Sequence, residues 1–285
     1  MTASRSAAQQ GGYALIAVLA ALVLFSALAF SLAASTGQAA AQGNAEFARA
    51  RAEAAAEAAV ALVVHDLANA DDAARAMLSG STRSVMFAGT RLSLRLADER
   101  GKVPINRLDP VQVTRLLVAA GVADEALAVP RDSLLDWLDG DEAQRPSGAE
   151  AQWYRPAGYR PRNGALQSIE ELSLIRGFPP ALVERIRPWI TVEPDAWPFD
   201  PTYATPTALA VMNGPAASGV AAIERARIEE GQQTAIALSD RTALVDRPMT
   251  IVIDAVTPDG GHVHREAVIA LSGSGAGTFM VRRWR

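Results

Sequence analysis

Residues 11–34 read GGYALIAVLAALVLFSALAFSLAA, and this stretch decides how the rest of the chain is organised. The run is almost purely apolar from Tyr13 onward, and no charged residue occurs between Arg5 and Glu46. A helix of this length rises about 33 Å, which is enough to cross the hydrocarbon core of a bilayer. The apolar core of a secretory signal peptide is usually only about 7–15 residues long. We therefore expect a retained spanning helix, with removal as a signal peptide as the alternative.

The segment that follows the apolar run is also predicted to be helical. Residues 46–78 are rich in Ala, Arg and Glu and contain neither Pro nor Gly. These residue types have high helix propensity. The sequence therefore predicts one long helix whose first part lies in a membrane and whose second part packs on a soluble domain. The expected packing face consists of Phe47, Ala50, Ala54, Ala58, Ala61, Leu62 and His65.

The composition restricts the chemistry that this chain can perform. The 285 residues carry a net charge of −4 and include no cysteine and only three histidines. Disulfides, thiol catalysis and cysteine-ligated metals are therefore excluded. A mildly acidic chain receives no general electrostatic help in binding nucleic acid. No phosphate-binding Gly-rich loop, nucleophilic serine turn or histidine beside a nucleophile is visible, so we expect no enzyme.

Strand patterns lie on both sides of a long helical region. The stretch 91–96 alternates between polar and apolar residues, which is typical of a half-buried strand. The C-terminal region predicts further strands at 249–254, 267–271 and 278–284. We expect these strands to pair with the first one and to cover the long helix. The resulting fold class is α+β with segregated elements, in which a helical insertion divides the sheet in sequence.

The insertion is predicted to contain short helices in hairpin-like pairs. Asp109 can cap a helix that Gly121 ends, and Ser168 with Glu171 has the spacing of a capping box for a helix that ends at Gly177. A third, degraded pair of helices is expected within residues 206–230. A helix, a Gly-containing turn and a second helix form the pattern of a helix–hairpin–helix motif.

Helix–hairpin–helix motifs can bind DNA, because backbone amides at the turn hold a phosphate. Here Pro179 follows the second turn and has no N–H to donate. Asp124 and Glu125 follow the first turn and repel phosphate. We therefore expect a packing unit and no binding of nucleic acid.

An acidic loop is the candidate metal site. Asp136, Asp139 and Asp141 fall close together, and Glu150 follows after the residues Pro-Ser-Gly. Oxygen ligands on a Gly-containing loop suit calcium, although the spacing differs from that of an EF-hand. Asp139, Asp141 and Glu150 are the predicted ligands, with Asp136 as a ligand or a supporting residue. The alternative is a solvated acidic loop whose aspartates cap helix ends.

The remaining aromatic and histidine residues have simpler interpretations. Trp137 is expected in the core, and Trp153 and Tyr154 are expected in the core rather than at a partner surface. His262 and His264 share one strand face. Without a third ligand in view, this pair is interpreted as exposed strand residues.

The N-terminus resembles that of type IV pilin-like proteins, which have a short leader ending in Gly before a spanning helix. The resemblance implies that prepilin peptidase cuts between Gly12 and Tyr13 and methylates the new amine. These proteins usually carry Glu at the fifth mature position, which here is Ala17. In ordinary subunits this glutamate is thought to meet the N-terminal amine of the neighbouring subunit in the filament. A subunit without it has no buried carboxylate that needs a partner, which fits a position at the tip with no subunit above.

Longer motifs resemble one pilin-like family, the type II secretion system protein K family of minor pseudopilins. They read ADERGKVPINRL, DWLDGDEAQRPSGAEAQWY, SIEELSLIRGFPPALVERIRPWITV and PTYATPTALAVM. Their order and spacing together carry the resemblance, which extends over nearly the whole chain.

This resemblance implies a pilin-like fold, with a long helix on an antiparallel sheet and an inserted all-α domain of helix-hairpin-helix/SAM-like repeats. The implied divisions are a leader at 1–12, a transmembrane helix at 13–34, its periplasmic continuation at 35–80, a sheet from 85–100 and 245–285, and an insertion at 101–240. It also raises the expectation of calcium in the acidic loop.

The implied function is that of a minor pseudopilin at the tip of the type II secretion pseudopilus, which initiates filament assembly and aids export of folded proteins. The implied partners are the I and J minor pseudopilins, prepilin peptidase and the bacterial inner membrane, with a single pass and most of the chain in the periplasm. The alternatives are a minor pilin of another type IV filament, a membrane-anchored competence-type DNA-binding protein, and a periplasmic enzyme or binder with a removed signal peptide.

Overall fold

The structure is a computed structural model that describes residues 7–69, 82–214, 244–272 and 279–285. Its helices are α1 (Ala7–Asn69), α3 (Pro110–Ala119), α4 (Ala128–Leu138), α5 (Ala151–Tyr154), α6 (Pro180–Ile186) and α7 (Pro206–Asn213). Its strands are β1 (Arg83–Phe87), β2 (Thr90–Asp98), β3 (Val103–Pro104), β4 (Ile190–Thr191), β5 (Met249–Val256), β6 (His262–Leu271) and β7 (Phe279–Trp284).

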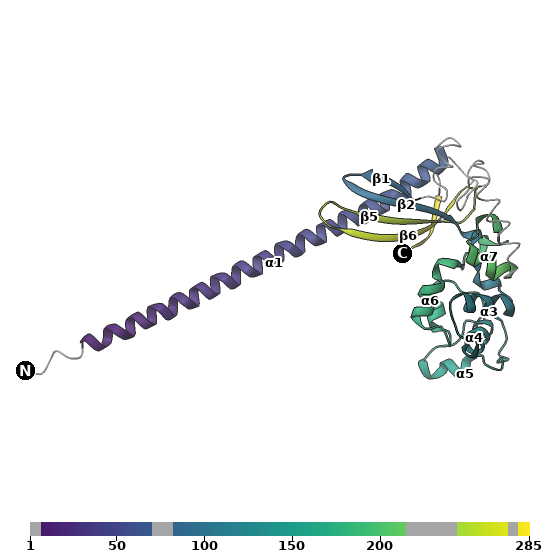
Figure 1. The fold of residues 1–285 in the computed structure, drawn as a ribbon, viewed down its shortest axis with the longest axis horizontal. Helices are drawn as coiled ribbons and strands as arrows, with labels where there is room; N and C mark the ends of the chain where they lie inside the picture. The colour runs from purple at the N-terminus through teal and green to yellow at the C-terminus, as the bar shows by residue number, and fades with distance from the viewer. Residues whose placement is uncertain (1–6, 70–81, 215–243, 273–278) are drawn as a thin grey trace, which may run out of the picture.

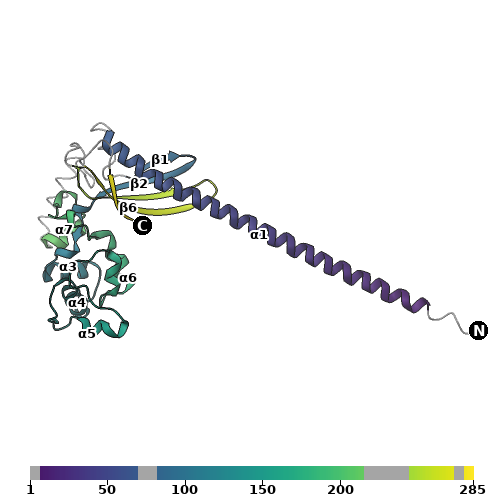
Figure 2. The same ribbon diagram turned by 180° about the vertical axis from the view of Figure 1, so that it is seen from behind.

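Helix α1 extends far beyond the rest of the molecule (Figure 1). It runs without a break through Gly37 and Gly43, and only its C-terminal part lies against the sheet (Figure 2). The predicted single long helix is therefore confirmed as far as Asn69. Its expected continuation to residue 80 lies outside the described residues.

The sheet contains five antiparallel strands in the order β1-β2-β5-β6-β7. Leu94 of β2 lies opposite Ile253 of β5, so the two halves of the sheet pair across the helical insertion as predicted. Burial alternates strictly along β2, because every second side chain faces α1. The α+β class and the packing of the N-terminal helix on the sheet are therefore confirmed.

Strand β1 is an element that the sequence analysis missed. It forms a hairpin with β2 in which Phe87 pairs with Thr90, leaving Ala88 and Gly89 as a two-residue turn. Both turn residues have positive φ, 47° and 78°, which is the conformation that such tight turns require. Gly89 was the sequence signal for this turn, because glycine readily adopts positive φ.

The predicted packing face of α1 is wrong. Phe47 is 63% exposed, and Ala50, Ala54 and Ala61 are also exposed. In an Ala-rich helix several faces have similar periodicity. The face that carries the larger Val and Leu side chains is the one that packs on the sheet, because its burial removes more apolar area from water. The buried face consists of Ala48, Ala52, Ala55, Ala56, Ala59, Val60, Val63, Val64, Leu67 and Ala68.

The inserted helices form a second core, separate from the core between α1 and the sheet. The carboxylate of Asp109 caps α3, and Gly121 follows that helix with φ +76°, as expected. Residues Ile169–Leu174 form a 3₁₀-helix rather than the expected α-helix, although the predicted capping contact from Ser168 N–H to Glu171 is present at 3.4 Å. In the expected third pair, α7 forms, and its partner lies outside the described residues.

Buried ion pairs lie where the chain passes from the sheet to the helical domain. The guanidinium of Arg247 donates to the carboxylate of Asp98, and the ammonium of Lys102 lies 2.5 Å from Glu99 Oε1. Burial alone would raise the pKa of Glu99, but Lys102 and the hydroxyls of Thr191 and Thr250 lower it below its ordinary value. The carboxylate is therefore ionised at neutral pH and fixes the position where the chain leaves the sheet.

Candidate functional site

The projecting half of α1 has the length and composition of a membrane span. Residues Leu15–Leu32 form one uninterrupted apolar stretch, and none of them is buried against the rest of the protein. Phe25 and Phe30 are among the most exposed large apolar side chains of the described chain. An apolar surface of this size on a water-facing helix would be strongly unfavourable, so a lipid environment is expected for it.

The predicted processing residues lie on the same helix. Gly12 and Tyr13 are part of α1, and Ala17 lies exposed at the start of its apolar stretch. The described backbone therefore continues as helix through the position of the expected cut. Cleavage and methylation stay predictions.

The acidic loop connects α4 and α5. Asp139 follows the end of α4 in an extended conformation, and Glu150 immediately precedes α5. The loop between them folds back, so that one carboxylate oxygen each from Asp139, Asp141 and Glu150 lies within 4.8 Å of the others. The structure therefore brings together the three residues predicted as calcium ligands.

Asp136 has a different position from the three grouped carboxylates. Its side chain is fully buried, and its Oδ1 accepts a hydrogen bond of 2.7 Å from Arg145 Nη1. A Cβ on Gly148 would lie 1.8 Å from Asp136 Oδ2, so only glycine allows the loop to pack this closely. Asp136 therefore holds the loop in shape and is better described as a supporting residue.

Several buried oxygens in or beside this loop have no hydrogen-bond partner among the described residues. They are both carboxylate oxygens of Glu150, Oδ1 of Asp139 and Oδ1 of Asn163. Burying an unpaired polar oxygen is unfavourable unless a proton or a cation satisfies it. Burial and then the neighbouring charges, led by Asp136 and Glu142, raise the pKa of Glu150 to about 7. A calcium ion suits these oxygen donors.

Asn163 is a residue of this site that the sequence analysis missed. It has φ +50°, and its Nδ2 donates to the backbone oxygen of Asp141 at 3.0 Å. The side chain therefore reaches the acidic loop from a segment far along the chain. The signal was the dipeptide Asn163-Gly164, which is typical of a turn with positive φ.

The aromatic residues near the loop separate into a buried group and one exposed residue. Trp137, Tyr154 and Tyr159 contact one another edge to face or tilted, with ring centroids 5.3–6.5 Å apart. Trp153 was expected in the core, and this was wrong, since it is 52% exposed. The guanidinium of Arg176 lies 3.8 Å above its ring, and this cation–π contact stabilises an aromatic residue that remains at the surface.

The turns of the two helical hairpins contact other parts of the helical domain. A Cβ on Gly177 would lie 2.9 Å from the backbone of Pro130, so this turn packs closely on α4. At the first turn, the guanidinium of Arg185 donates to the backbone oxygen of Ala120. Gly121 and Gly177 themselves are exposed, and the absence of nucleic-acid binding stays a prediction.

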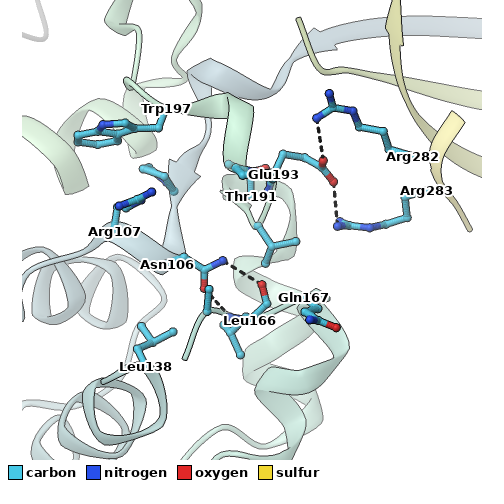
Figure 3. Close-up of a pocket in the computed structure, with 14 residues that line it drawn as sticks. Asn106, Arg107, Leu138, Leu166, Gln167, Thr191, Glu193, Trp197, Arg282 and Arg283 are labelled. Atoms are coloured by element: carbon cyan, nitrogen blue, oxygen red, sulfur yellow. Dashed lines mark hydrogen bonds and ion pairs between the residues drawn. The ribbon is translucent and has the colours of Figure 1, made fainter. Parts of the chain in front are cut away.

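A cavity of about 620 Å³ lies between the helical domain and β7 (Figure 3). Arg282 and Arg283 approach it from β7, and both pair with the carboxylate of Glu193. Asn106 lies deeper and exchanges hydrogen bonds of 2.9 and 2.8 Å with the backbone of Leu166. Asp195 also pairs with Arg282, so two carboxylates balance the two arginines. We therefore interpret the cavity as a contact region between the sheet and the insertion and not as an anion site.

A shallower apolar hollow of about 370 Å³ lies between α1 and the edge strand β7. Its wall is mostly apolar and is formed by side chains of α1 and of the edge strand β7. The lining residues are Glu57, Val60, Ala61, Phe279, Val281 and Trp284. This hollow gives the pilin-like part of the molecule an apolar surface beside the long helix.

The fold and these sites define a class of protein: a helix of membrane length packed on an antiparallel sheet, with a helical domain inserted between the strands. Residues 91–195 match the family described as type II secretion system (T2SS), protein K. The match falls on the family that the motifs resemble, the type II secretion system protein K family.

Two individual proteins are similar to the chain. The type II secretion system protein K of Klebsiella pneumoniae is 34% identical over 96 residues, which are 33% of this chain and 28% of that relative. A chain in the crystal structure of the GspK-GspI-GspJ complex from the enterotoxigenic Escherichia coli type 2 secretion system has a TM-score of 0.54 and 16% identity. That match covers 88% of this chain and 98% of the other, and at this identity it shows the fold alone.

Proposed function

We propose that this protein is a minor pseudopilin that occupies the tip of a type II secretion pseudopilus, initiates filament assembly and so aids export of folded proteins. The observation that carries the proposal is α1, in which an exposed apolar half of membrane length continues directly into a half packed on the sheet. Such a helix can join a bundle of similar helices while the sheet and insertion remain on the periplasmic side. The role is mechanical and needs no catalytic residue.

Two features support a position at the end of the filament. Ala17 stands where pilin-like subunits usually carry a glutamate, so the apolar part of α1 has no carboxylate there that needs a partner. The helical domain lies at the end of the molecule opposite to the N-terminus (Figure 1). A bulky domain at that end would obstruct the addition of a further subunit above it.

We propose that I-type and J-type minor pseudopilins contact the apolar hollow between α1 and β7. The similar crystal structure is that of a complex named GspK-GspI-GspJ, which favours partners of this kind. Trp284 and Phe279 flank the exposed side of α1 at Ala61, where a small side chain allows another helix to approach closely. Contact would remove this apolar surface from water.

We also propose that the acidic loop binds calcium through Asp139, Asp141 and Glu150. The unpaired buried oxygens of Glu150 and Asp139 support this assignment, because they are donors of the type that calcium prefers. Bound calcium would neutralise the grouped carboxylates and fix the connection between α4 and α5. Its contribution is therefore to stability of the helical domain.

The helical domain itself is proposed to consist of helix-hairpin-helix/SAM-like units that pack on each other. The contacts of Gly177 with Pro130 and of Arg185 with Ala120 support this arrangement. We propose no binding of nucleic acid by these units.

The proposed function is tested by expressing the full chain with I-type and J-type pseudopilins and prepilin peptidase in a bacterial inner membrane. We expect mass spectrometry to show a methylated N-terminal Tyr13, and we expect both partners to co-purify with the chain. Trp284→Glu should abolish this co-purification, and Phe47→Glu, on another face of α1, should leave it unchanged. A mature chain that starts beyond Ala34 would falsify the proposal. Ala17→Glu should shift the subunit from filament ends to positions along the shaft in labelled pseudopili, and unchanged end labelling would contradict the role assigned to Ala17.

A further inference from the structure

The face of the sheet that points away from α1 carries a group of residues unrelated to the acidic loop. Along β6, Val263 and Ala267 are buried against the core under α1, and the side chains at 262, 264 and 266 point to the opposite face. His262 and His264 lie on this outer face and are 61% and 53% exposed. Both imidazoles are therefore accessible from solvent and lie on the same side of the strand.

The register of the sheet places a carboxylate between these two histidines. Asp254 of β5 lies directly opposite His264 of β6. Its Oδ1 is 2.8 Å from His264 Nδ1 and 3.7 Å from His262 Nε2. Two ring nitrogens from β6 thus converge on one carboxylate oxygen from the neighbouring strand β5.

Two of the three separations that a metal centre needs are close to the required value. Ligands of a tetrahedral ion with bonds of about 2.0–2.1 Å lie roughly 3.3 Å apart. The two distances to Asp254 Oδ1, 2.8 and 3.7 Å, lie on either side of this value, and rotation of the exposed imidazole rings must bring the two ring nitrogens to the same separation around an ion. Exposed side chains on a rigid sheet can make such rotations without a change in the backbone.

We propose that His262, His264 and Asp254 form a binding site for a divalent transition metal of the zinc type. Imidazole nitrogen with one carboxylate is a donor set that suits zinc, copper or nickel and is a poor match for calcium or magnesium. Three protein ligands leave one position of the ion open to water or to a residue of another molecule. This inference does not depend on the proposed function.

Glu266 completes the arrangement as a positioning residue. Its Oε1 lies 3.8 Å from Nε2 of His264, on the side of the ring opposite to Asp254. When an ion takes the place of the hydrogen between Nδ1 and Asp254, the ring hydrogen lies on Nε2, and a carboxylate on this side stabilises that tautomer. The acidic loop, by contrast, offers only oxygen donors from Asp139, Asp141 and Glu150. The two sites should therefore select different ions.

The test is calorimetric titration of the full chain in detergent micelles with zinc chloride, in buffer that contains saturating calcium. We expect one zinc ion per chain, with at least about tenfold weaker binding after His264→Gln or Asp254→Asn, since even residues that only orient a ligand contribute this much. His65→Gln is the matched control, because His65 belongs to α1 and its Nδ1 lies 3.6 Å from Asp66, which is not one of the proposed ligands. Its affinity for zinc should equal that of the unmodified chain.

A second measurement excludes indirect effects of the substitutions. Proton NMR of the histidine rings should show that zinc shifts the signals of His262 and His264 and leaves that of His65 unchanged. Zinc binding that persists at full affinity in His264→Gln overturns the proposal. Binding that survives in the histidine variants but is lost in Glu150→Gln also overturns it, because the ion would then lie in the acidic loop.

Discussion

The two cores of this protein are built on different physical grounds. Between α1 and the sheet, side chains such as Val63, Leu67 and Ile253 bury only carbon, and the regular periods of a helix and a strand place them there. The helical domain also has an apolar centre around Trp137, but it additionally buries the carboxylates of Asp136 on α4 and of Glu150 in the acidic loop. One core depends on regular patterning, and the other depends on how individual charges are satisfied.

This difference indicates that the two parts should respond differently to solution conditions. Apolar burial is nearly independent of pH and of divalent cations. A buried carboxylate makes stability depend on both, because its protonation and its counter-ion change. We therefore expect the α1 and sheet unit to act as a constant scaffold and the helical domain to be the ion-sensitive part.

The largest expected effects come from matched truncations in the two cores. Trp137→Ala should lower the unfolding free energy of the helical domain by about 3–5 kcal/mol, and Leu67→Ala should lower that of the α1 and sheet unit by about 2–5 kcal/mol. Trp137 Nε1 has no hydrogen-bond partner among the described residues, so its loss is one of packing. Hydrogen exchange measured by mass spectrometry on each unit should locate the two losses separately. Equal destabilisation of both units by either variant would contradict the division into two cores.

The next effect concerns the junction between the units. Glu99→Gln removes the charge that pairs with Lys102 and should cost roughly 3 kcal/mol at neutral pH, the lower end of what loss of one buried partner costs. Because the pKa of Glu99 is lowered on folding, its contribution is present above the ordinary carboxyl range and is lost as the pH falls below it. Chemical denaturation should therefore show a larger difference between variant and parent at pH 7 than at pH 3. Thr207→Ala in the same region is the control with little expected change.

The acidic loop should give a smaller effect of opposite sign. The pKa of Glu150 rises from 4.5 to about 7 on folding, so without a cation the folded state favours its protonated form. The contribution of the protonated Glu150 to the stability of the fold is complete below pH 4.5, decreases from there to pH 7 and is lost above pH 7. At about 1.4 kcal/mol per pKa unit, the total loss is up to about 3 kcal/mol. Glu150→Gln should therefore be more stable than the parent at pH 8 in the presence of a chelator, as measured by thermal unfolding.

Calcium should make the parent more stable than Glu150→Gln. Millimolar calcium is expected to raise the melting temperature of the parent at pH 8 and to leave that of Glu150→Gln nearly unchanged. Asp124→Asn, an acidic position elsewhere in the helical domain, should retain the full calcium response. A parent whose melting temperature ignores calcium would remove the proposed site.

The smallest effect is expected at the face of α1 that the sequence analysis chose wrongly. Phe47→Ala should change the unfolding free energy by no more than about 0.5 kcal/mol, because Phe47 is exposed and away from the core. Val63→Ala, four turns further along on the buried face, should cost clearly more. A comparison of the two by denaturant unfolding tests the assignment of the faces directly.

Much of the fold could be predicted because local signals were strong. The uncharged run before Glu46, the alternation along β2 and the cap at Asp109 each depend on neighbours in sequence, and all three led to the correct element. The face of α1 could not be predicted in the same way, because alanines on several sides give similar periodicity. Trp153 was misplaced because its exposure depends on Arg176, a partner far along the chain.

The sequence by itself determined the long apolar helix, the strands divided by a helical insertion and the residues of the acidic loop, since period, propensity and turn chemistry act over short distances. Only the tertiary structure decided which side of α1 is buried, how Asn163 reaches the loop and that Asp254 lies between His262 and His264. These arrangements depend on contacts between segments far apart in sequence. Their free energies arise from strand register and side-chain packing, which no local pattern encodes.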